Sequence, residues 1–123
     1  MEKLGLGPEK CLKLNESLVY GRMTGWGQHG PMSNQAGHDI NYISLSGALN
    51  AIGDQNSNPS IPLNLVGDYG GGGMMLAMGI LAGVIRSSKT GKGQVIDSAM
   101  IDVRLSLMSF FHSLKEMGIW KDE

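Results

Sequence analysis

The sequence has little of the chemistry that marks secreted, metal-binding or polyanion-binding proteins. It contains a single cysteine, Cys11, so no disulfide can form within the chain. Its formal net charge is only −1, and its basic residues are scattered, which leaves no electrostatic footprint for nucleic acid or an acidic membrane surface. No secretory signal opens it. We therefore expect a cytoplasmic or organelle-matrix protein that binds neither nucleic acid nor a membrane.

Common nucleotide-binding and catalytic motifs are also missing. The glycine run 67–73 does not form Gly-x-Gly-x-x-Gly, because Met75 and Leu76 occupy the third-glycine positions. Residues 89–93 lack the Gly-Lys-Ser/Thr ending of a phosphate loop, and we interpret them as a basic helix C-terminus. There is no Cys/His cluster with zinc spacing and no Gly-x-Ser-x-Gly elbow. These absences exclude the usual dinucleotide, phosphate-loop, zinc and hydrolase readings.

Long hydrophobic runs are absent as well. The longest, residues 74–85, is too short and too interrupted by glycine to cross a bilayer, which needs about 20 residues. We interpret it as a core helix. Glycine and methionine are abundant, at 19 and 9 residues. Methionine can line an adaptable pocket, although it more often fills irregular space in a core.

Hydrophobic periodicity and turn residues predict alternating helices and strands. The expected elements are a helix at 8–14, a strand at 17–23, a helix at 35–52, an extended segment at 63–66, a helix at 69–87, a strand at 94–99 and a helix at 100–117. This order indicates an α/β fold with helices around a small, mostly parallel sheet, whose ligand side would include the loop 24–31. So few strands, and a last helix that is apolar around much of its circumference, suggest that residues 1–123 form one partial domain of a larger fold.

Two acid–base residues occupy equivalent places in this pattern. Asp68 precedes a glycine-rich helix start, where a carboxylate meets unpaired N–H groups and the positive end of the helix dipole. The simpler alternative is that Asp68 only caps the helix. His38 opens the helix before it, with Asp39 beside it and Tyr42 one turn later; its alternatives are a capping or a core histidine. Two such helix starts facing one cleft could hold a substrate carbon between two bases, with N–H groups near Asp68 binding an oxyanion.

Four motifs, in order, carry a resemblance to a known family. They are Gly-Arg-Met-Thr-Gly-Trp-Gly-Gln at 21–28, Ala-Gly-His-Asp-Ile-Asn-Tyr at 36–42, Leu-Asn-Leu-Val-Gly-Asp-Tyr-Gly-Gly-Gly at 63–72 and Thr-Gly-Lys-Gly-Gln-Val-Ile-Asp at 90–97. Together they resemble the alpha-methylacyl-CoA racemases, a group within the family III CoA-transferase superfamily. The resemblance covers essentially the whole chain and implies part of the Rossmann-like large domain of that fold.

The resemblance also implies an activity. It is that of an isomerase of fatty acid metabolism, which transfers a proton at C2 of a 2-methylacyl-CoA thioester through a planar enolate, with the acyl-CoA as substrate and no metal or redox cofactor. His38 and Asp68 match the two acid–base positions, the histidine on the S side and the aspartate on the R side. The substrate-binding or orienting positions that it implies are Gly37, Asp39, Tyr42, Tyr69, Gly70 and Gly71.

Two alternatives stay open beside this reading. CoA-transferases of the same fold keep the aspartate, which there forms an anhydride with the acyl group, but they lack the Gly-His-Asp motif, so His38 favours a racemase. Family members are much longer than this chain, which lacks their main CoA-binding segment, their small domain and the carboxylate that would tune Asp68. The second alternative is therefore an inactive oligomeric remnant. Whether the chain is active or a remnant, we expect its apolar surfaces to be covered in a homo-oligomer or by a complementing chain.

Overall fold

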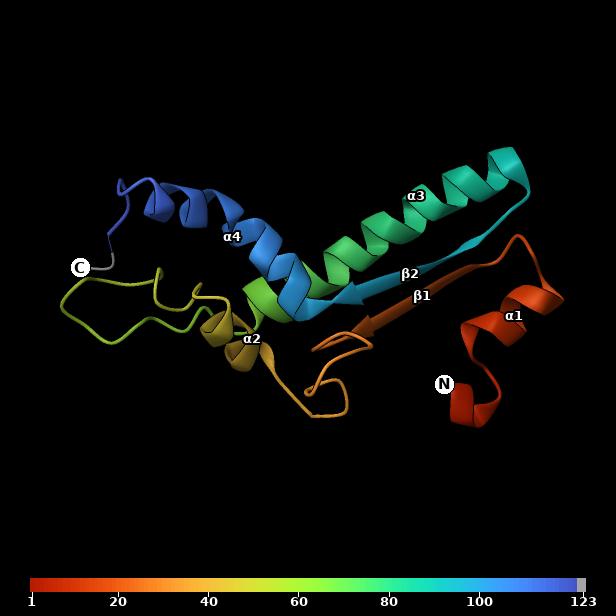
Figure 1. Cartoon of the computed structure of the whole chain (residues 1–123), viewed down its shortest axis with the longest axis horizontal. Helices are drawn as coiled ribbons and strands as arrows, with labels where there is room; N and C mark the ends of the chain where they lie inside the picture. Colours follow the sequence, from red (N-terminus) through yellow and green to blue (C-terminus); the bar gives the residue numbers. More distant parts are fainter. Residues whose placement is uncertain (122–123) are drawn as a thin grey trace.

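The computed structural model describes residues 1–121 of the chain. The molecule is elongated, with the two strands and one long helix at one end and a second long helix at the other (Figure 1). In chain order the elements are η1 (Glu2–Leu4), α1 (Pro8–Leu14), β1 (Val19–Thr24), α2 (Asp39–Leu45), η2 (Leu65–Gly73), α3 (Met74–Thr90), β2 (Gln94–Ala99) and α4 (Met100–Glu116). The predicted α/β class with a small parallel sheet is confirmed, since β1 and β2 pair in parallel.

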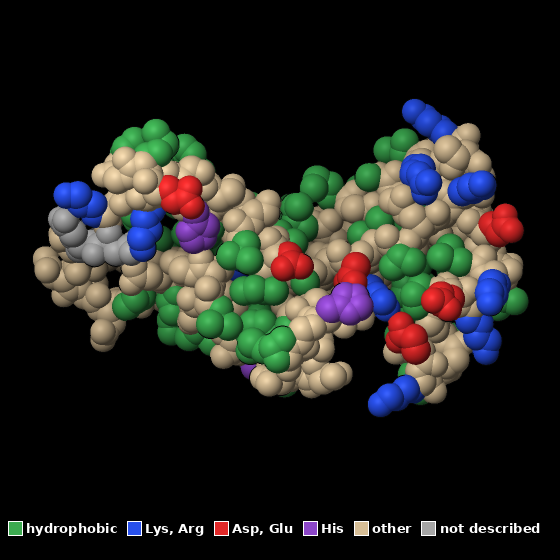
Figure 2. Space-filling view, viewed as in Figure 1, with side chains coloured by type: hydrophobic (Ala, Val, Ile, Leu, Met, Phe, Trp, Pro, Cys, Tyr) green, Lys and Arg blue, Asp and Glu red, His purple; other side chains and the backbone are tan. Residues whose placement is uncertain are grey.

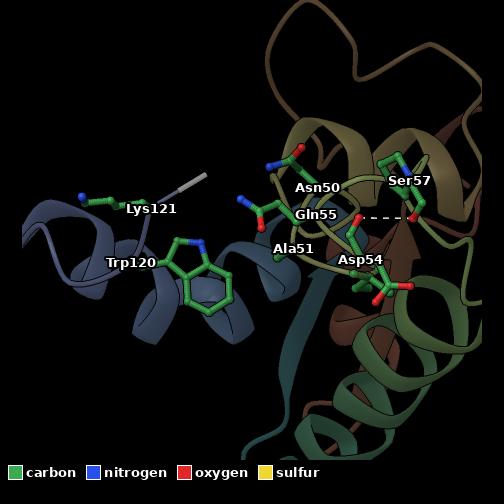
Figure 3. A pocket seen from close by; sticks show the side chains of 10 residues that line it. Asn50, Ala51, Asp54, Gln55, Ser57, Trp120 and Lys121 are labelled. Carbon is green, nitrogen blue, oxygen red and sulfur yellow. Dashed lines mark hydrogen bonds between the residues drawn. The ribbon is translucent and has the colours of Figure 1, made fainter. Parts of the chain in front are cut away.

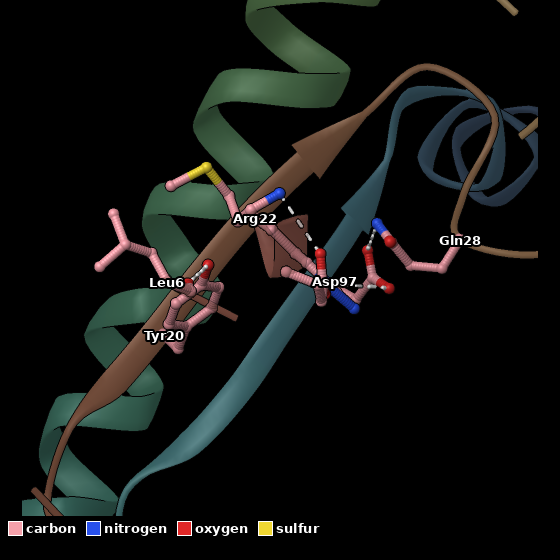
Figure 4. A network of polar contacts seen from close by, with 7 residues as sticks. Leu6, Tyr20, Arg22, Gln28 and Asp97 are labelled. Carbon is pink, nitrogen blue, oxygen red and sulfur yellow. Dashed lines mark hydrogen bonds and ion pairs between the residues drawn. The ribbon is translucent and has the colours of Figure 1, made fainter. Parts of the chain in front are cut away.

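The register of the sheet places Arg22 of β1 opposite Asp97 of β2. Figure 4 shows the arginine reaching across to this carboxylate, with Nε of Arg22 3.7 Å from Oδ2 of Asp97. Gln28, from the loop after β1, donates a long hydrogen bond of 3.5 Å to the same side chain. Nη1 of Arg22 also donates to Glu2 at 2.8 Å. These contacts connect η1, which contains Glu2, to both strands.

Glycine residues let α3 pack closely on the sheet. A Cβ at Gly79 would lie 2.7 Å from Ile96 of β2, and a Cβ at Gly83 would lie 2.8 Å from Val19 of β1. Real Cβ atoms do not approach other heavy atoms this closely, because the repulsion at that distance is steep. The two glycines, one turn apart on one face, therefore set the distance between α3 and both strands.

Helix α2 is much shorter than the predicted helix 35–52. His38 has an extended backbone, with φ −132° and ψ 171°, so the helix begins only at Asp39. Gly47 takes a left-handed φ of +79°, and α2 has already ended at Leu45. The periodic apolar residues beyond Gly47 belong to turns, which the spacing of three to four residues also fits. The predicted helix was too long at both ends, because His38 is extended and because Gly47, which follows the C-cap residue Ser46, is left-handed.

The segment η2 also differs from its prediction, since the extended stretch expected at 63–66 is absent. Residues Leu65–Gly73 instead form a π-helix that continues directly into α3, which the sequence predicted to start at 69. In this wide turn a Cβ at Gly70 or Gly71 would lie only 3.0 Å from the carbonyl oxygen five residues earlier. The glycine run therefore makes π winding possible, because side chains would crowd those carbonyl groups.

The remaining boundaries lie near their predictions. Helix α1 and strand β2 have the expected bounds, and α4 ends one residue early. Strand β1 begins two residues later and ends one residue later than predicted. Helix α3 ends at Thr90. Its C-cap is Gly91, whose φ is +70° and whose N–H donates to the carbonyl oxygen of Ser87 at 2.8 Å. Gly91 thus supplies the left-handed stop that the sequence predicted.

The buried apolar core of residues 1–121 is small and consists of Tyr42, Ile43, Ala48 and Ala99. The prediction that residues 74–85 form a core helix is therefore wrong for most of that run. Its large exposed apolar residues are Met74, Met78, Leu81, Val84 and Ile85. Figure 2 shows apolar side chains spread over the visible surface, while charged ones gather mainly near the end that carries α1. Residues 1–121 leave these apolar side chains of α3, and others on α4, uncovered.

One continuous helical stretch, Leu65–Thr90, is long and apolar enough to cross a membrane by length and composition. It is longer than the apolar run in the sequence because η2 and α3 join without a break. A single stretch of this kind says little, since core helices of globular proteins have the same properties. Here one side of α3 packs against both strands.

Candidate active site

The candidate site lies where the carboxyl ends of both strands meet α2, η2 and the start of α4, near the middle of the molecule in Figure 1. The carbonyl oxygen of Gly25, just beyond β1, accepts the N–H of Ile101 at 3.1 Å, which joins the loop after β1 to α4. This is the edge at which open α/β sheets hold their ligands. It is also where the motifs around His38 and Asp68 come together.

His38 is the N-cap residue of α2. Its backbone N–H donates to Oδ1 of Asn41 at 2.9 Å, and its carbonyl oxygen accepts the N–H of Asn41 at 2.9 Å. These bonds fix the backbone at the helix start while the histidine side chain is exposed. The alternative of a core histidine is therefore wrong, whereas that of a capping histidine agrees with the place of His38 as the N-cap residue. The imidazole is accessible to a ligand.

Asp68 lies in the first turn of η2 and is half-buried. The cap of this helix is Asn64, and no side-chain cap bond is formed, so the interpretation of Asp68 as an N-cap is wrong. The helix begins three residues before Asp68, because the glycine run allows π winding there. The carboxylate of Asp68 is thus not held by its own helix terminus.

Asp39 joins the two segments. Its side chain is 4% exposed, and Oδ2 accepts the N–H of Gly67 at 2.5 Å and the N–H of Asp68 at 2.7 Å. A carboxylate at the start of a helix is favoured by the N–H groups and by the helix dipole. The residue after His38 therefore holds the backbone of Asp68. It also narrows one prediction, because the N–H groups of Gly67 and Asp68 bind Asp39, and an oxyanion near Asp68 would need other donors.

Tyr42 fills the space behind these residues. It is 2% exposed, and its ring packs edge-on against Trp26 with 4.7 Å between ring centres. A Cβ at Gly37 would lie 2.9 Å from the Tyr42 hydroxyl oxygen, and one at Gly25 would overlap the same group. Gly37 is thus required for packing of this tyrosine.

Arg104 is the site residue that sequence reasoning missed. This side chain of α4 is 1% exposed, and its guanidinium carbon lies 5.1 Å from the centre of the Tyr42 ring. Burial lowers the pKa of Arg104, whereas the negative charges of Asp39 and Asp68 raise it. Burial also raises the pKa of Tyr42, with a further increase from Asp68. The sequence did contain a signal for this residue, because Arg104 is the one arginine in a predicted helix that is apolar on most sides.

The other predicted positions lie in η2. Tyr69 is 61% exposed, so it does not join the buried cluster of Asp39, Tyr42 and Arg104. Gly70 and Gly71 serve the π winding described above, and a Cβ at Gly71 would touch Arg104 at 3.8 Å. What approaches the glycine run most closely is therefore this chain's own backbone and side chains.

Two cavities formed by the described residues lie away from the site. One of 420 Å³, shown in Figure 3, lies between the loop around Asp54 and Trp120, which follows α4. A second, of 350 Å³, lies beside Arg22. Neither is lined by His38 or Asp68. Within residues 1–121, no three His, Cys, Asp or Glu side chains cluster as metal ligands would.

Comparisons with known proteins agree with the family that the motifs indicated. Over 121 residues the chain is 50% identical to the Alpha-methylacyl-CoA racemase of Mus musculus and 46% identical to that of Homo sapiens. Each match covers 98% of this chain and 32% of the relative, so the chain spans about a third of the length of these curated relatives. A CAIB/BAIF family protein from Brucella suis has a similar structure, with a TM-score of 0.83 and 28% identity over 95% of this chain and 31% of that one. Residues 1–118 match the model described as CoA-transferase family III, and the chain belongs to that family.

Proposed function

We propose that the chain is the acid–base segment of an alpha-methylacyl-CoA racemase, in which His38 and Asp68 exchange the proton at C2 of a 2-methylacyl-CoA. The observation that carries the proposal is the bond from the N–H of Asp68 to Asp39, because it ties one base to the residue beside the other. The identity of 50% to a protein named as such a racemase supports the same reading. We place the activity in the cytoplasm or an organelle matrix.

In the proposed reaction one base removes the C2 proton, and the electron pair of the C–H bond moves onto the thioester oxygen to form an enolate. The second residue, protonated beforehand, then donates its proton to the opposite face of C2. With the S epimer His38 is the base and Asp68 the acid, and with the R epimer the roles reverse. No electrons are gained or lost, so no redox cofactor is required. A histidine can play both parts near neutral pH.

The enolate oxygen needs hydrogen-bond donors in this mechanism. The backbone N–H groups of Gly67 and Asp68 already donate to the carboxylate of Asp39. The donors to the substrate must therefore be other groups. In a complete protein they can come from parts of the relatives that lie outside this chain, as can the remaining contacts to CoA.

A CoA-transferase is the second candidate, and the family description supports it. In that reaction the Asp68 carboxylate would attack the thioester carbonyl, release CoA as a thiolate and carry the acyl group as an anhydride. The half-buried carboxylate without a cap bond is compatible with such a role. His38 would then have no part in the chemistry, which separates the two proposals.

The test is incubation with a 2-methylacyl-CoA in deuterated water, followed by mass spectrometry of the acyl group. It uses the purified chain, alone and mixed with a polypeptide that supplies the rest of a relative. Deuterium at C2 is expected for the racemase. Transfer of CoA to a free acid, with no deuterium at C2, would establish the transferase. If neither sample shows either reaction, the remaining interpretation is an inactive oligomeric remnant.

The variants His38→Ala and Asp68→Ala test the two roles. Losing a positioned acid or base reduces a rate by about 10²–10⁴, so each variant should lose epimerisation almost completely. His112→Ala changes an exposed histidine of α4 and is the matched control, with a rate close to that of the parent. Epimerisation at the parental rate by either site variant would contradict the assignment.

A further inference from the structure

Arg104 and Asp39 are two buried, oppositely charged groups whose hydrogen bonding is incomplete. Among residues 1–121, none accepts a hydrogen bond from Nε, Nη1 or Nη2 of Arg104, and none donates to Oδ1 of Asp39. Both side chains are more than nine-tenths buried. A buried charge is tolerated only where an opposite charge or hydrogen bonds offset the loss of water. Each of these groups therefore depends on the other.

Gly67 lies between the two charges. A Cβ on this residue would overlap both Nη2 of Arg104 and Oδ2 of Asp39. The guanidinium and the carboxylate thus reach the same point from different elements, separated by the space that one methyl group would fill. The same Oδ2 atom accepts the N–H groups of Gly67 and Asp68. The guanidinium therefore places a positive charge near the carboxylate oxygen that accepts the two N–H groups.

We propose that Arg104 is a positioning residue for Asp68: its charge holds the Asp39 carboxylate in place, and that carboxylate fixes the Gly67–Asp68 backbone from which the Asp68 side chain extends. Arginine suits this part because its guanidinium stays protonated even when it is buried. The guanidinium also lies over the Tyr42 ring, with its carbon 5.1 Å from the ring centre, a cation–π contact that favours this position. The consequence for catalysis rests on the proposed function, whereas the coupling between Arg104 and Asp39 does not.

The coupling is tested first, without any activity measurement. Urea-unfolding midpoints are compared for the parent, Arg104→Met, Asp39→Asn and the double variant. Methionine keeps much of the arginine stem but removes the charge. We expect the double variant to lose much less than the sum of the two single losses, because removing both charges leaves no unpaired charge. Arg86→Met, which removes an exposed arginine of α3, should add its effect to that of Asp39→Asn. Strict additivity of Arg104→Met with Asp39→Asn would overturn the proposal.

The positioning role is then tested by deuterium exchange at C2 in the sample that is active. We expect Arg104→Met to lower kcat by about tenfold or more with little change in KM, and Arg104→Lys, which restores a charge, to recover part of the rate. If Arg104→Met does not fold, Arg104→Lys and Asp39→Asn carry the same comparison. Parental kcat in folded Arg104→Met would refute the role. A parent that exchanges no deuterium, with the coupling intact, would refute the proposed function and leave only the structural link.

Discussion

At the scale of single residues, the absence of a side chain at Gly67 decides whether the charged cluster can form. We expect Gly67→Ala to destabilise the fold by about 1–3 kcal/mol or more, because the new methyl group overlaps Arg104 and Asp39. The measurement is the free energy of unfolding in urea. The loss should shrink when Arg104→Met is added, since the overlapping nitrogen is then gone.

Gly91→Ala is the control for this prediction. Gly91 has a φ of +70° with no atom within 4 Å of the added Cβ, so alanine there suffers only backbone strain of about 1–2 kcal/mol. That loss should be the same with or without Arg104→Met. If Arg104→Met reduced the loss in Gly91→Ala as much as the loss in Gly67→Ala, overlap with Arg104 would not be the cause of the loss at Gly67.

Tyr42 makes stability depend on pH at the alkaline end. Because burial raises the pKa of Tyr42 above its unfolded value, the folded state retains a proton that the unfolded state releases. This contribution is complete below about pH 10, the ordinary tyrosine value, and is lost as pH rises through the folded pKa. Tyr42→Phe should flatten the decline in unfolding free energy above pH 10. Tyr69→Phe, at an exposed position, should leave the parental slope, and an unchanged slope in Tyr42→Phe would contradict this account.

At the scale of elements, close packing of α3 on the sheet depends on small residues along one face. Gly83→Val should force α3 away from Val19 of β1 and destabilise the fold by about 1–3 kcal/mol. Ala82→Val, at the neighbouring exposed position, is the control without the clash. It lowers helix propensity, whereas Gly83→Val does not, so propensity alone predicts the larger loss for Ala82→Val. Unfolding in urea compares the two. A loss in Gly83→Val no larger than that in Ala82→Val would mean that contact with the strand does not set the effect.

Helix and strand boundaries show which elements the sequence predicts well. The predicted bounds of strand 94–99 were correct because its β-branched residues lie between a glycine and a helix start. Those of helix 8–14 were correct because a proline begins the helix. Helix 35–52 was too long, because Gly47 took a left-handed conformation inside a periodic pattern. The π-helix was missed because its hydrogen bonds span five residues, a spacing that apolar periodicity does not report.

At the scale of the whole molecule, the exposed apolar residues of α3 and α4 predict self-association. Phe110 and Leu107 of α4 are 64% and 55% exposed, and Met74 and Leu81 of α3 exceed 60%. Burial of such side chains is favourable by about 25 cal/mol per Å² of apolar surface. We expect the isolated chain to elute as a dimer or larger species and to bind free CoA weakly.

Light scattering at micromolar concentration measures this directly, with calorimetry for CoA. Phe110→Ser should shift the distribution toward smaller species, whereas Ser109→Ala on the same helix should not, since it removes no apolar surface. A well-folded monomer of the parent, or tight CoA binding by that monomer, would contradict the prediction and make the chain a self-sufficient domain.

The sequence by itself determined the α/β class, most element positions, the two candidate bases and the family, because these depend on local patterns and short motifs. Only the tertiary structure decided that Asp39 binds the N–H groups of Gly67 and Asp68, that Arg104 is buried beside them and that the apolar faces of α3 and α4 are left uncovered. The reason is physical: periodicity and caps report interactions between residues a few positions apart. The charged cluster instead joins α2, η2 and α4, and no local pattern specifies which side chains will share one buried space once those elements pack.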